Sequence, residues 1–292
     1  MLATCSSTAC LWLLLVTTAL AQGKLDLNKA DDALRASQKI QCSLTDGKPV
    51  VFWWKGSAYS RVAGERDRLL FNVEGMNVRA CKAFHDPQRG YGYRLVSREI
   101  LLYKDPATEQ VLRTWKNPWT NQQNEVIHVS NDPVNQGPFY ANKTFTLPAT
   151  FKNGRFIYSV EVPLFYPNPL GGEYQEFAGG TYHALEMFNF YGYESELLDA
   201  TKQEADRVTV SWARVSDWLP WMEMGDRQGM MIFSCVGKRL ASWDEMSETM
   251  KGEIKQNYPA YTAPPPLLLH RWIKDTIQTG RMKFSEQQFQ IT

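Results

Sequence analysis

The sequence lacks the motifs that mark the large cofactor-dependent enzyme classes. It has no Gly-x-Ser-x-Gly nucleophile turn, no His-Glu-x-x-His zinc motif, no phosphate-binding loop and no dinucleotide fingerprint. The cysteines form neither a Cys-x-x-Cys pair nor the spacing of a zinc site. We therefore expect no cofactor and no bound metal, so that any reaction would use this chain's own side chains.

An excess of charge of one sign is also missing, because 32 Lys and Arg residues balance 31 Asp and Glu residues. No run of Lys or Arg stands out, which argues against nucleic acid or an anionic membrane as a partner. After the N-terminal segment, no apolar run approaches the roughly 18 residues that span a bilayer. We expect neither nucleic-acid binding nor stable membrane insertion.

The N-terminus has the pattern of a secretory signal peptide. Ala9–Leu20 is apolar but too short to span a bilayer, and Ala19-Leu20-Ala21 supplies a small-x-small cleavage pattern. We predict a signal peptide at residues 1–21, cleavage after Ala21 and a secreted protein. Asn142-Lys143-Thr144 is a sequon, so Asn142 is the expected glycosylation site in a host that glycosylates exported proteins.

Cysteine is scarce, with five residues in the chain. Removal of the signal peptide leaves Cys42, Cys81 and Cys235. An odd number in an exported chain allows at most one disulfide and leaves one free thiol. The spacing does not determine which two of the three residues pair.

Tyr91–Asn135 contains three consecutive runs rich in β-branched and aromatic residues. The runs Tyr93–Tyr103, Val111–Trp115 and Val126–Ser130 are separated by Asp-Pro and Asn-Pro turns, and Asn131-Asp132-Pro133 is expected to end the third. Strands joined by tight turns predict an antiparallel meander, the beginning of a sheet or barrel.

Further strand patterns lie on both sides of this meander. In Val50–Arg61, alternation places Trp53 on one face and Phe52 and Trp54 on the other. Gly75, in the next strand, is expected to mark a bulge or bend. The other expected strands are Leu69–Ala80, Pro138–Phe145, Arg155–Pro163 after an Asn-Gly turn, Thr181–Tyr191, Arg207–Trp218 and Gly229–Gly237.

Helical patterns occur near the two ends, at Asn28–Gln38, 242–258 and 267–280, and Glu194–Glu204 fits a loop or a short helix. Roughly nine to eleven strands without a regular alternation of strands and helices favour an all-β fold over an α/β fold. We predict one domain over residues 22–292, a single antiparallel, lipocalin-like β-barrel with flanking helices.

The first polar cluster follows the meander. Alternation places His128 on the polar face of its strand, and Asp132 follows at the strand end, so the two could be a base and its orienting group. The alternative is structural, with Asp132 in a turn and His128 bonded to the backbone.

The second cluster is Thr181–Tyr191. Tyr182, Glu186 and Phe188 share one face, and a carboxyl group among rings has a raised pKa that suits a general acid. The alternative is a buried ion pair between Glu186 and an arginine of a neighbouring strand, such as Arg94 or Arg214.

The third cluster places Trp212, Arg214 and Trp218 on one face of a strand. A guanidinium between indoles could hold an anionic or carbonyl-bearing ligand. The alternative is that Trp218-Leu219-Pro220-Trp221 closes one end of a barrel.

Three motifs, KIQCSLTDGKPVVFWWKGSAYS, LLYKDPATEQVLRTWKNPW with VIHVSNDPVN, and WARVSDWLPWMEMGDRQG, resemble the family of proteins of unknown function numbered 1838. The resemblance covers about Leu25–Pro266 and leaves Leu267–Gly280 outside the pattern. It implies an exported protein similar to lipocalin-type barrels, and it assigns no catalytic residue.

We hypothesise a pocket for an apolar or aromatic small molecule, lined by Trp53 or Trp54 with Tyr182, Glu186, Trp212, Arg214 and Trp218. A catalytic version would be a cofactor-free isomerase, cyclase or dehydratase of specialised metabolism, with Glu186 or His128 moving protons and Asp132 supporting them. One alternative is a carbohydrate-binding or glycoside-cleaving protein using two carboxylates among Glu186, Asp132 and Glu74. The other is a non-catalytic structural or interaction protein. The sequence does not determine the oligomeric state.

Overall fold

The computed structural model describes residues 23–167 and 180–266. The predicted signal peptide, most of the loop after Pro167 and the predicted helix 267–280 lie outside the described residues. Among the described residues, no helix is both long and apolar enough to cross a membrane.

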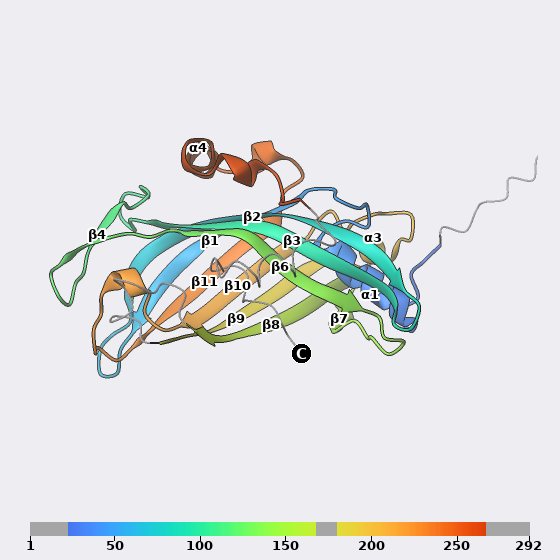
Figure 1. Ribbon diagram of the computed structural model, residues 1–292, viewed down its shortest axis with the longest axis horizontal. Coiled ribbons are helices and arrows are strands. Elements are labelled where there is room, and N and C mark those ends of the chain that lie inside the picture. Colours follow the sequence, from blue (N-terminus) through green and yellow to red (C-terminus); the bar gives the residue numbers. More distant parts are fainter. Residues whose placement is uncertain (1–22, 168–179, 267–292) are drawn as a thin grey trace, which may run out of the picture.

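Nine antiparallel strands form one strongly curled sheet in the order β6-β3-β2-β1-β11-β10-β9-β8-β7 (Figure 1). The all-β prediction is confirmed, and the barrel is a half-barrel, because β6 and β7 are its two edges. The strands of this sheet are β1 Val50–Arg61, β2 Arg68–Asp86, β3 Gly90–Lys104, β6 Val129–Tyr140, β7 Ala149–Lys152, β8 Arg155–Pro167, β9 Thr181–Tyr193, β10 Thr209–Ser216 and β11 Met230–Arg239. A separate hairpin consists of β4 Thr114–Lys116 and β5 Gln123–Glu125.

The predicted three-stranded meander is wrong beyond its first strand, because the second strand, β4, pairs with β5 in a separate hairpin. The β4–β5 hairpin lies between β3 and β6 in the sequence but is not part of the nine-stranded sheet. The neighbour of β3 at this edge is β6. The prediction ended the strand at Asn131-Asp132-Pro133, but β6 continues through this segment to Tyr140. A proline has no N–H for a sheet ladder, and an edge strand tolerates this because one of its sides is unpaired. The edge position explains why Pro133 and Pro138 both lie within β6.

Side chains of the curled sheet alternate between a concave and a convex face. In β1, Phe52 and Trp54 point to the concave side, whereas Trp53 lies on the convex side, which confirms the predicted alternation. The Asn153-Gly154 turn between β7 and β8 is also confirmed, because both residues have positive φ angles, as this hairpin turn requires.

Gly75 in β2 is not a bulge, because the β1–β2 register is continuous there and shifts only between Ala58 and Tyr59. Glycine is instead needed at this position because a side chain would collide with a neighbouring ring. A Cβ atom added at Gly75 would lie 2.4 Å from the indole of Trp54, so that indole packs directly on the β2 backbone.

The helix α4 (Glu248–Asn257) covers the convex face over β2 and β3 (Figure 1). Its apolar side is Met250 and Ile254, which pack with Met76 and Ile100 of the sheet. The predicted span 242–258 is divided, because a short 3-10 turn at Trp243–Glu245 precedes the helix. The N-cap is Ser247, whose Oγ accepts the N–H of Met250 at 3.1 Å. A second 3-10 turn, Pro259–Thr262, follows.

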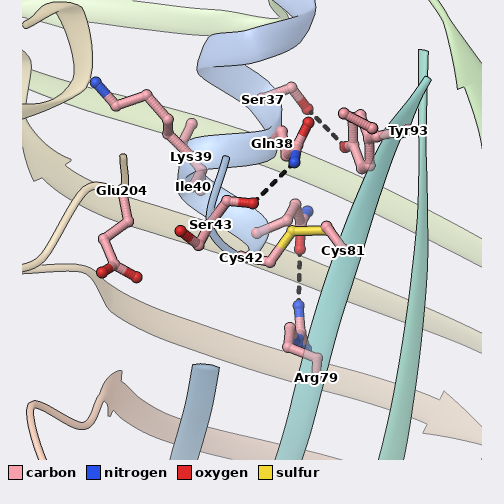
Figure 2. The surroundings of a disulfide bond; sticks show 12 residues. Ser37, Gln38, Lys39, Ile40, Cys42, Ser43, Arg79, Cys81, Tyr93 and Glu204 are labelled. Carbon is pink, nitrogen blue, oxygen red and sulfur yellow. Dashed lines mark hydrogen bonds between the residues drawn. A yellow bond between two sulfur atoms is a disulfide. The ribbon is translucent and has the colours of Figure 1, made fainter. Parts of the chain in front are cut away.

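The helix α1 (Ala30–Gln41) closes one end of the curl, three residues longer at its C-terminus than predicted. A disulfide between Cys42 and Cys81 fixes the residue after α1 to β2 (Figure 2). Within the described part of the chain, the free cysteine is Cys235, which is buried. A covalent link of this kind stabilises the fold mainly by restricting the unfolded chain.

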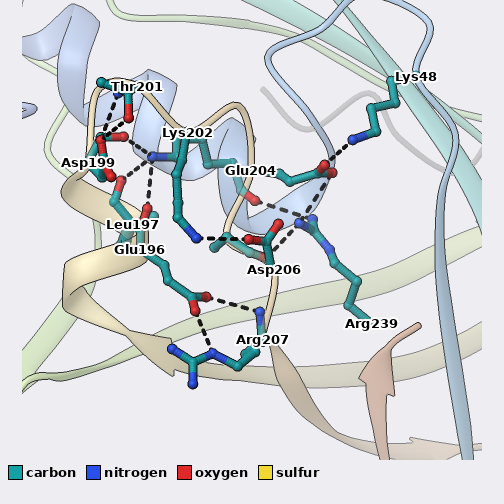
Figure 3. A network of polar contacts seen from close by, with 12 residues as sticks. Lys48, Glu196, Leu197, Asp199, Thr201, Lys202, Glu204, Asp206, Arg207 and Arg239 are labelled. Carbon is teal, nitrogen blue, oxygen red and sulfur yellow. Dashed lines mark hydrogen bonds and ion pairs between the residues drawn. The ribbon is translucent and has the colours of Figure 1, made fainter. Parts of the chain in front are cut away.

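Two buried cations bind the ends of helices on this side of the molecule, and Figure 3 shows one of them, Arg239, beside Glu204. Lys39 Nζ donates to the carbonyls of Glu196, Leu197 and Asp199, at the end of α3 (Glu194–Leu198). Arg239 donates to the carbonyls of Lys39, Ile40 and Cys42 at the end of α1. Carbonyls at a helix C-terminus have no partner within the helix, so these contacts satisfy them and favour a positive charge.

Candidate functional site

The concave face of the sheet encloses a cavity of about 320 Å³. Most of its lining comes from β1, β2, β3 and β6 on one side and from β8, β9 and β10 on the other. This volume is in the lower part of the range for small-molecule sites, roughly 300–1,000 Å³. The half-barrel therefore has room for one small guest.

Aromatic rings form much of the cavity wall. The indoles of Trp54 and Trp212 have centroids 6.2 Å apart, and Phe188 stacks on Trp212 at 6.4 Å. All three line the cavity. Of the two tryptophans that the sequence left open, Trp54 faces the cavity, in the position that Gly75 makes possible. Tyr182 also lines it.

Glu186 and Arg214 point into the same cavity from adjacent strands. They are paired in the β9–β10 ladder, with Arg214 Nη1 3.4 Å from Glu186 Oε1. The Arg214 guanidinium lies 5.4 Å from the ring centroid of Tyr182 and 5.7 Å from that of Phe233. The sequence left open whether Glu186 pairs with Arg94 or with Arg214, and in the structure its partner is Arg214.

The environment favours the neutral form of Glu186. Burial raises the pKa of its carboxyl group to about 8, and the charge of Glu99 adds to the increase. Arg214 acts in the opposite direction, but its contact is longer than the about 2.7–2.9 Å of a close charge-assisted hydrogen bond. Burial and the like charge therefore set the direction.

Glu99 on β3 is a cavity carboxylate that the sequence reasoning missed. It accepts hydrogen bonds from Ser97 Oγ at 3.0 Å and from Asn77 Nδ2 at 3.3 Å. Asn77 lies directly opposite it on β2. The available signal was the alternation of β3, since Ser97 and Glu99 share one face.

Arg79 extends this polar chain towards α1. Its Nε donates to Asn77 Oδ1 and its Nη1 donates to Gln41 Oε1, both at 2.8 Å. The side chain lines the cavity although the residue is only 7% exposed, and burial lowers its pKa to about 10. An arginine remains charged at such a value, so the chain Arg79–Asn77–Glu99 joins a cation to an anion through an amide.

The match to a protein family covers every strand of the nine-stranded sheet and α4. Residues 47–275 match the family described as protein of unknown function, DUF1838. The chain belongs to the DUF1838 family. The resemblance found in the three motifs is confirmed. The DUF1838 match begins later than Leu25 and ends beyond Pro266, inside the segment expected to lie outside the pattern. A search of curated proteins found no match.

His128 lines the cavity of this DUF1838 protein, but its ring is bound to the backbone. Its Nδ1 accepts the N–H of Tyr103 at 3.1 Å, so the proton of the neutral ring is on Nε2. Burial lowers the pKa of His128 to about 4. The ring is also stacked on Tyr103, with centroids 5.9 Å apart. This geometry favours the structural interpretation of His128 over a role as base.

The structure does not bring Asp132 or Glu74 to Glu186. Asp132 pairs with Arg98 Nε at 2.8 Å, and Arg98 also donates to the carbonyls of Ala260 and Ala263 in the C-terminal segment. Glu74 pairs with Lys104 at 3.2 Å. Both carboxylates therefore form ion pairs outside the cavity lining, on the convex side of the sheet. Asp132 was placed with His128 because the strand was expected to end there, whereas β6 continues as an alternating strand.

Trp53 and Trp218 also lie outside the cavity lining. Trp53 Nε1 donates to Glu74 Oε1 at 2.8 Å on the convex face. Trp218 packs on Trp119 and donates to the carbonyl of Arg227 at 2.9 Å. Trp221 beside it packs among Phe71, Tyr103 and Trp115, at the end opposite α1. These contacts agree with the alternative in which this segment closes one end of the sheet.

The assembled DUF1838 site is an apolar chamber with two carboxyl groups and two guanidinium groups in its wall. Among the described residues, no group of three or more potential metal ligands occurs. The chemistry that these residues can perform is proton transfer and the binding of a polar end of a ligand.

Proposed function

We propose that this protein binds one small, largely apolar molecule in the concave cavity and rearranges it by proton transfer, without a cofactor. The reaction class is isomerisation, cyclisation or dehydration. The observation that carries the proposal is the shared cavity of Glu186 and Glu99, which reach it from β9 and β3 under different electrostatic conditions.

The two carboxyl groups have complementary roles. Glu186, held neutral by burial, donates a proton to a ligand oxygen or carbon. Glu99, which accepts hydrogen bonds from Ser97 and Asn77, removes a proton elsewhere on the ligand. One proton enters the ligand and one leaves it, so an isomerisation is balanced, and loss of a protonated hydroxyl gives dehydration. Two carboxyl groups in different surroundings of one site can divide acid and base roles.

The aromatic wall has the second role, the binding of the ligand body. Trp54, Phe188 and Trp212 present ring faces to the cavity, and Arg214 provides donors for an oxygen at its end. Apolar walls with a few fixed polar groups are typical of ligand pockets. A largely apolar site also strengthens the electrostatic effect of Arg214 on developing negative charge.

The test begins with the bound molecule. Extracts of wild-type protein, of Val160→Trp and of Val236→Trp are compared by mass spectrometry. Val160 lines the cavity, whereas Val236 is 69% exposed, so the two variants differ only in where the indole is added. We expect a small molecule to be retained by wild type and Val236→Trp and lost from Val160→Trp. Equal retention by both variants would place the ligand elsewhere.

Catalysis is tested on the molecule so identified. Glu186→Gln and Glu99→Gln are each expected to lower turnover at least about 100-fold, the usual loss for a general acid or base. Glu161→Gln, which is exposed on β8, is the matched control and is expected to keep wild-type turnover. Wild-type turnover by Glu186→Gln would reduce the proposal to ligand binding alone.

We also propose that the protein is exported. The Cys42–Cys81 disulfide supports this, because disulfides persist mainly in oxidising compartments. Expression of the full chain in a secreting host, with the mature N-terminus sequenced from the medium, tests export and the cleavage site together. Retention of the whole chain inside the cells would contradict it.

A further inference from the structure

We infer that the ligand has a hydroxylated end, with neighbouring uncharged hydroxyl groups that bind to the β2–β3–β6 side of the cavity. Its apolar body lies against the opposite side. The inference rests on the proposed ligand cavity and names the chemical class of the molecule that fills it.

A row of polar side chains crosses three adjacent strands on the β2–β3–β6 side. Asn131 of β6 lies directly opposite Glu99 of β3, and Glu99 lies directly opposite Asn77 of β2. Directly opposed residues have their Cβ atoms about 4.5–5.5 Å apart on one face of a sheet. All three residues line the cavity. The row therefore places an amide, a carboxyl group and a second amide side by side.

Two further side chains extend this row. Arg79 is two residues after Asn77, so it lies on the same face of β2. Gln136 of β6 lies opposite Leu95, which shares a face of β3 with Glu99. Both Arg79 and Gln136 line the cavity. The polar wall of the cavity thus consists of Asn77, Arg79, Glu99, Asn131 and Gln136.

The polar wall has hydrogen-bonding atoms that no described residue uses. Ser97 and Asn77 both donate to Oε1 of Glu99, and in the described part of the chain no donor reaches Oε2. Arg79 donates through Nε and Nη1, whereas Nη2 has no acceptor among residues 23–167 and 180–266. The Arg79 guanidinium also lies 4.9 Å from the ring centroid of Phe52, which restricts its orientation. One acceptor and one donor are therefore left for a ligand.

The amides of Asn131 and Gln136 add to these two atoms. Both residues are half-buried on the edge strand β6, and neither side chain has a hydrogen-bond partner among the described residues. Each amide has an acceptor oxygen and two donor hydrogens. Polar groups of this kind are normally paired when they are buried, so a ligand that covers them has to bond with them.

Hydroxyl groups match this mixture of donors and acceptors. One hydroxyl can donate to Glu99 Oε2 while a neighbouring one accepts from Arg79 Nη2. A carboxylate has only acceptors and an ammonium group has only donors, so neither can satisfy both atoms. The match holds for either protonation state of Glu99, because a hydroxyl can also accept from a carboxyl O–H. The proposed function assigns proton removal to Glu99, and a hydroxyl at Oε2 presents such a proton.

The opposite side of the cavity binds the apolar body. β8 contributes Val160, Val162 and Leu164 to the lining. Phe188 of β9 lies directly opposite Val160, and Trp212 of β10 lies directly opposite Phe188. The ligand is therefore amphiphilic, with its hydroxyl groups towards β3 and its apolar body towards β8–β10.

Two naphthyl ethers test the inference. 2-Naphthyl β-D-xylopyranoside and 2-(cyclohexyloxy)naphthalene both join a naphthyl group to a six-membered ring, and only the first has hydroxyl groups. Equilibrium dialysis, followed by naphthyl fluorescence, measures both dissociation constants. We expect Asn131→Leu to weaken xyloside binding at least about fivefold, the effect of one lost hydrogen bond, without weakening binding of the cyclohexyl ether.

Asn135→Leu is the matched control. Asn135 is also half-buried on β6 but lies outside the cavity lining, so both dissociation constants should stay unchanged. Gln136→Met should weaken xyloside binding selectively, as Asn131→Leu does, and it replaces Asn131→Leu if circular dichroism shows that this variant does not fold. Val160→Trp should abolish cavity binding of both probes, which identifies any binding to the outer surface.

The outcomes separate the inference from the proposed function. Equal weakening of the two probes by Asn131→Leu, or unchanged xyloside binding in both Asn131→Leu and Gln136→Met, would overturn the hydroxylated ligand and leave the cavity as a ligand site. Binding of the cyclohexyl ether alone would do the same. Binding of neither probe in the cavity would contradict the proposed function itself.

Discussion

Glu186 and Arg214 are direct partners across the β9–β10 ladder, and their Oε1 and Nη1 atoms lie 3.4 Å apart inside the cavity. The same carboxyl group is influenced by Glu99 from a strand on the other side of the curl. Glu186 is thus placed between a cation of the neighbouring strand and an anion of a distant one. Its protonation depends on the curvature of the sheet as well as on its own strand.

Glu186→Gln is expected to become more stable than wild type as the pH rises. Folding raises the pKa of Glu186 from 4.5 to about 8, so the stability linked to this group is complete below pH 4.5 and is lost as the pH rises through about 8. Glutamine does not titrate. Each pKa unit corresponds to about 1.4 kcal/mol, so the difference in unfolding free energy reaches a few kcal/mol at most.

Urea unfolding of both proteins at a series of pH values between 5 and 9 measures this difference. Glu161→Gln, on the exposed side of β8, is the matched substitution. A constant difference between Glu186→Gln and wild type over this range would show that Glu186 is ionised throughout.

Gly75→Ala is expected to destabilise the protein by about 1–3 kcal/mol, the usual cost of overpacking. The added methyl group would meet the indole of Trp54 at 2.4 Å, which forces the ring into the cavity. Ligand retention should fall with it. Gly252→Ala in α4 is the control, because no atom lies within 4 Å of its added Cβ and alanine favours a helix. Equal melting of the two variants would contradict close packing at Gly75.

His128→Ala is expected to lower stability without a specific loss of catalysis. The substitution leaves the buried N–H of Tyr103 without its acceptor, at a cost of about 1–3 kcal/mol. His183→Ala is the matched control, because His183 is exposed on β9. Thermal unfolding and turnover are measured together. A folded His128→Ala variant with turnover reduced by about 100-fold would instead identify His128 as a proton-transfer group.

Loss of the Cys42–Cys81 disulfide is expected to cost about 4 kcal/mol, as estimated from the chain entropy of the 39-residue separation. The double substitution Cys42→Ser with Cys81→Ser tests this by chemical unfolding. Cys235→Ser, at the buried free thiol, provides the comparison and should have a much smaller effect. Similar losses in the two proteins would mean that burial of the sulfur atoms, and not the covalent link, is what matters.

An N-glycan at Asn142 is expected when the chain is secreted from a glycosylating host. Asn142 is exposed in the turn after β6, with Thr144 exposed beside it. Digestion with an N-glycosidase should reduce the mass of wild type and leave Asn142→Gln unchanged. Thr144→Ala should match Asn142→Gln, because it removes the sequon without changing the asparagine.

Local patterns in the sequence predicted much of the fold. The alternation in Val50–Arg61 gave the bounds of β1 and its two faces, and Asn153-Gly154 gave the turn between β7 and β8. The same reasoning placed Glu186, Trp212 and Arg214 on one surface. A period of two residues defines a face wherever a strand is regular.

Long-range pairing could not be predicted in this way. Glu99 and Arg79 acquire their roles from Asn77, which β2 places beside both, and no local pattern contains that register. Alternation places Trp53 and Trp54 on opposite faces of β1, but it does not indicate which face α4 covers. That depends on the packing of a helix almost 200 residues later. Asp132 was misplaced because the prolines of an edge strand resemble those of a turn.

Among the described residues the sheet has two unpaired edges, which affect how copies of this protein can meet. An exposed strand edge normally recruits further strands, which is how sheets extend into fibres. Along β6, Pro133 and Pro138 replace two N–H donors, and β7 is only four residues long. Beyond Tyr158, β7 no longer covers β8, and in that part of the edge Pro163 removes a further donor. A neighbouring strand would therefore find only short runs of consecutive hydrogen bonds at either edge. The sheet can therefore keep its concave face open without becoming a template for polymerisation.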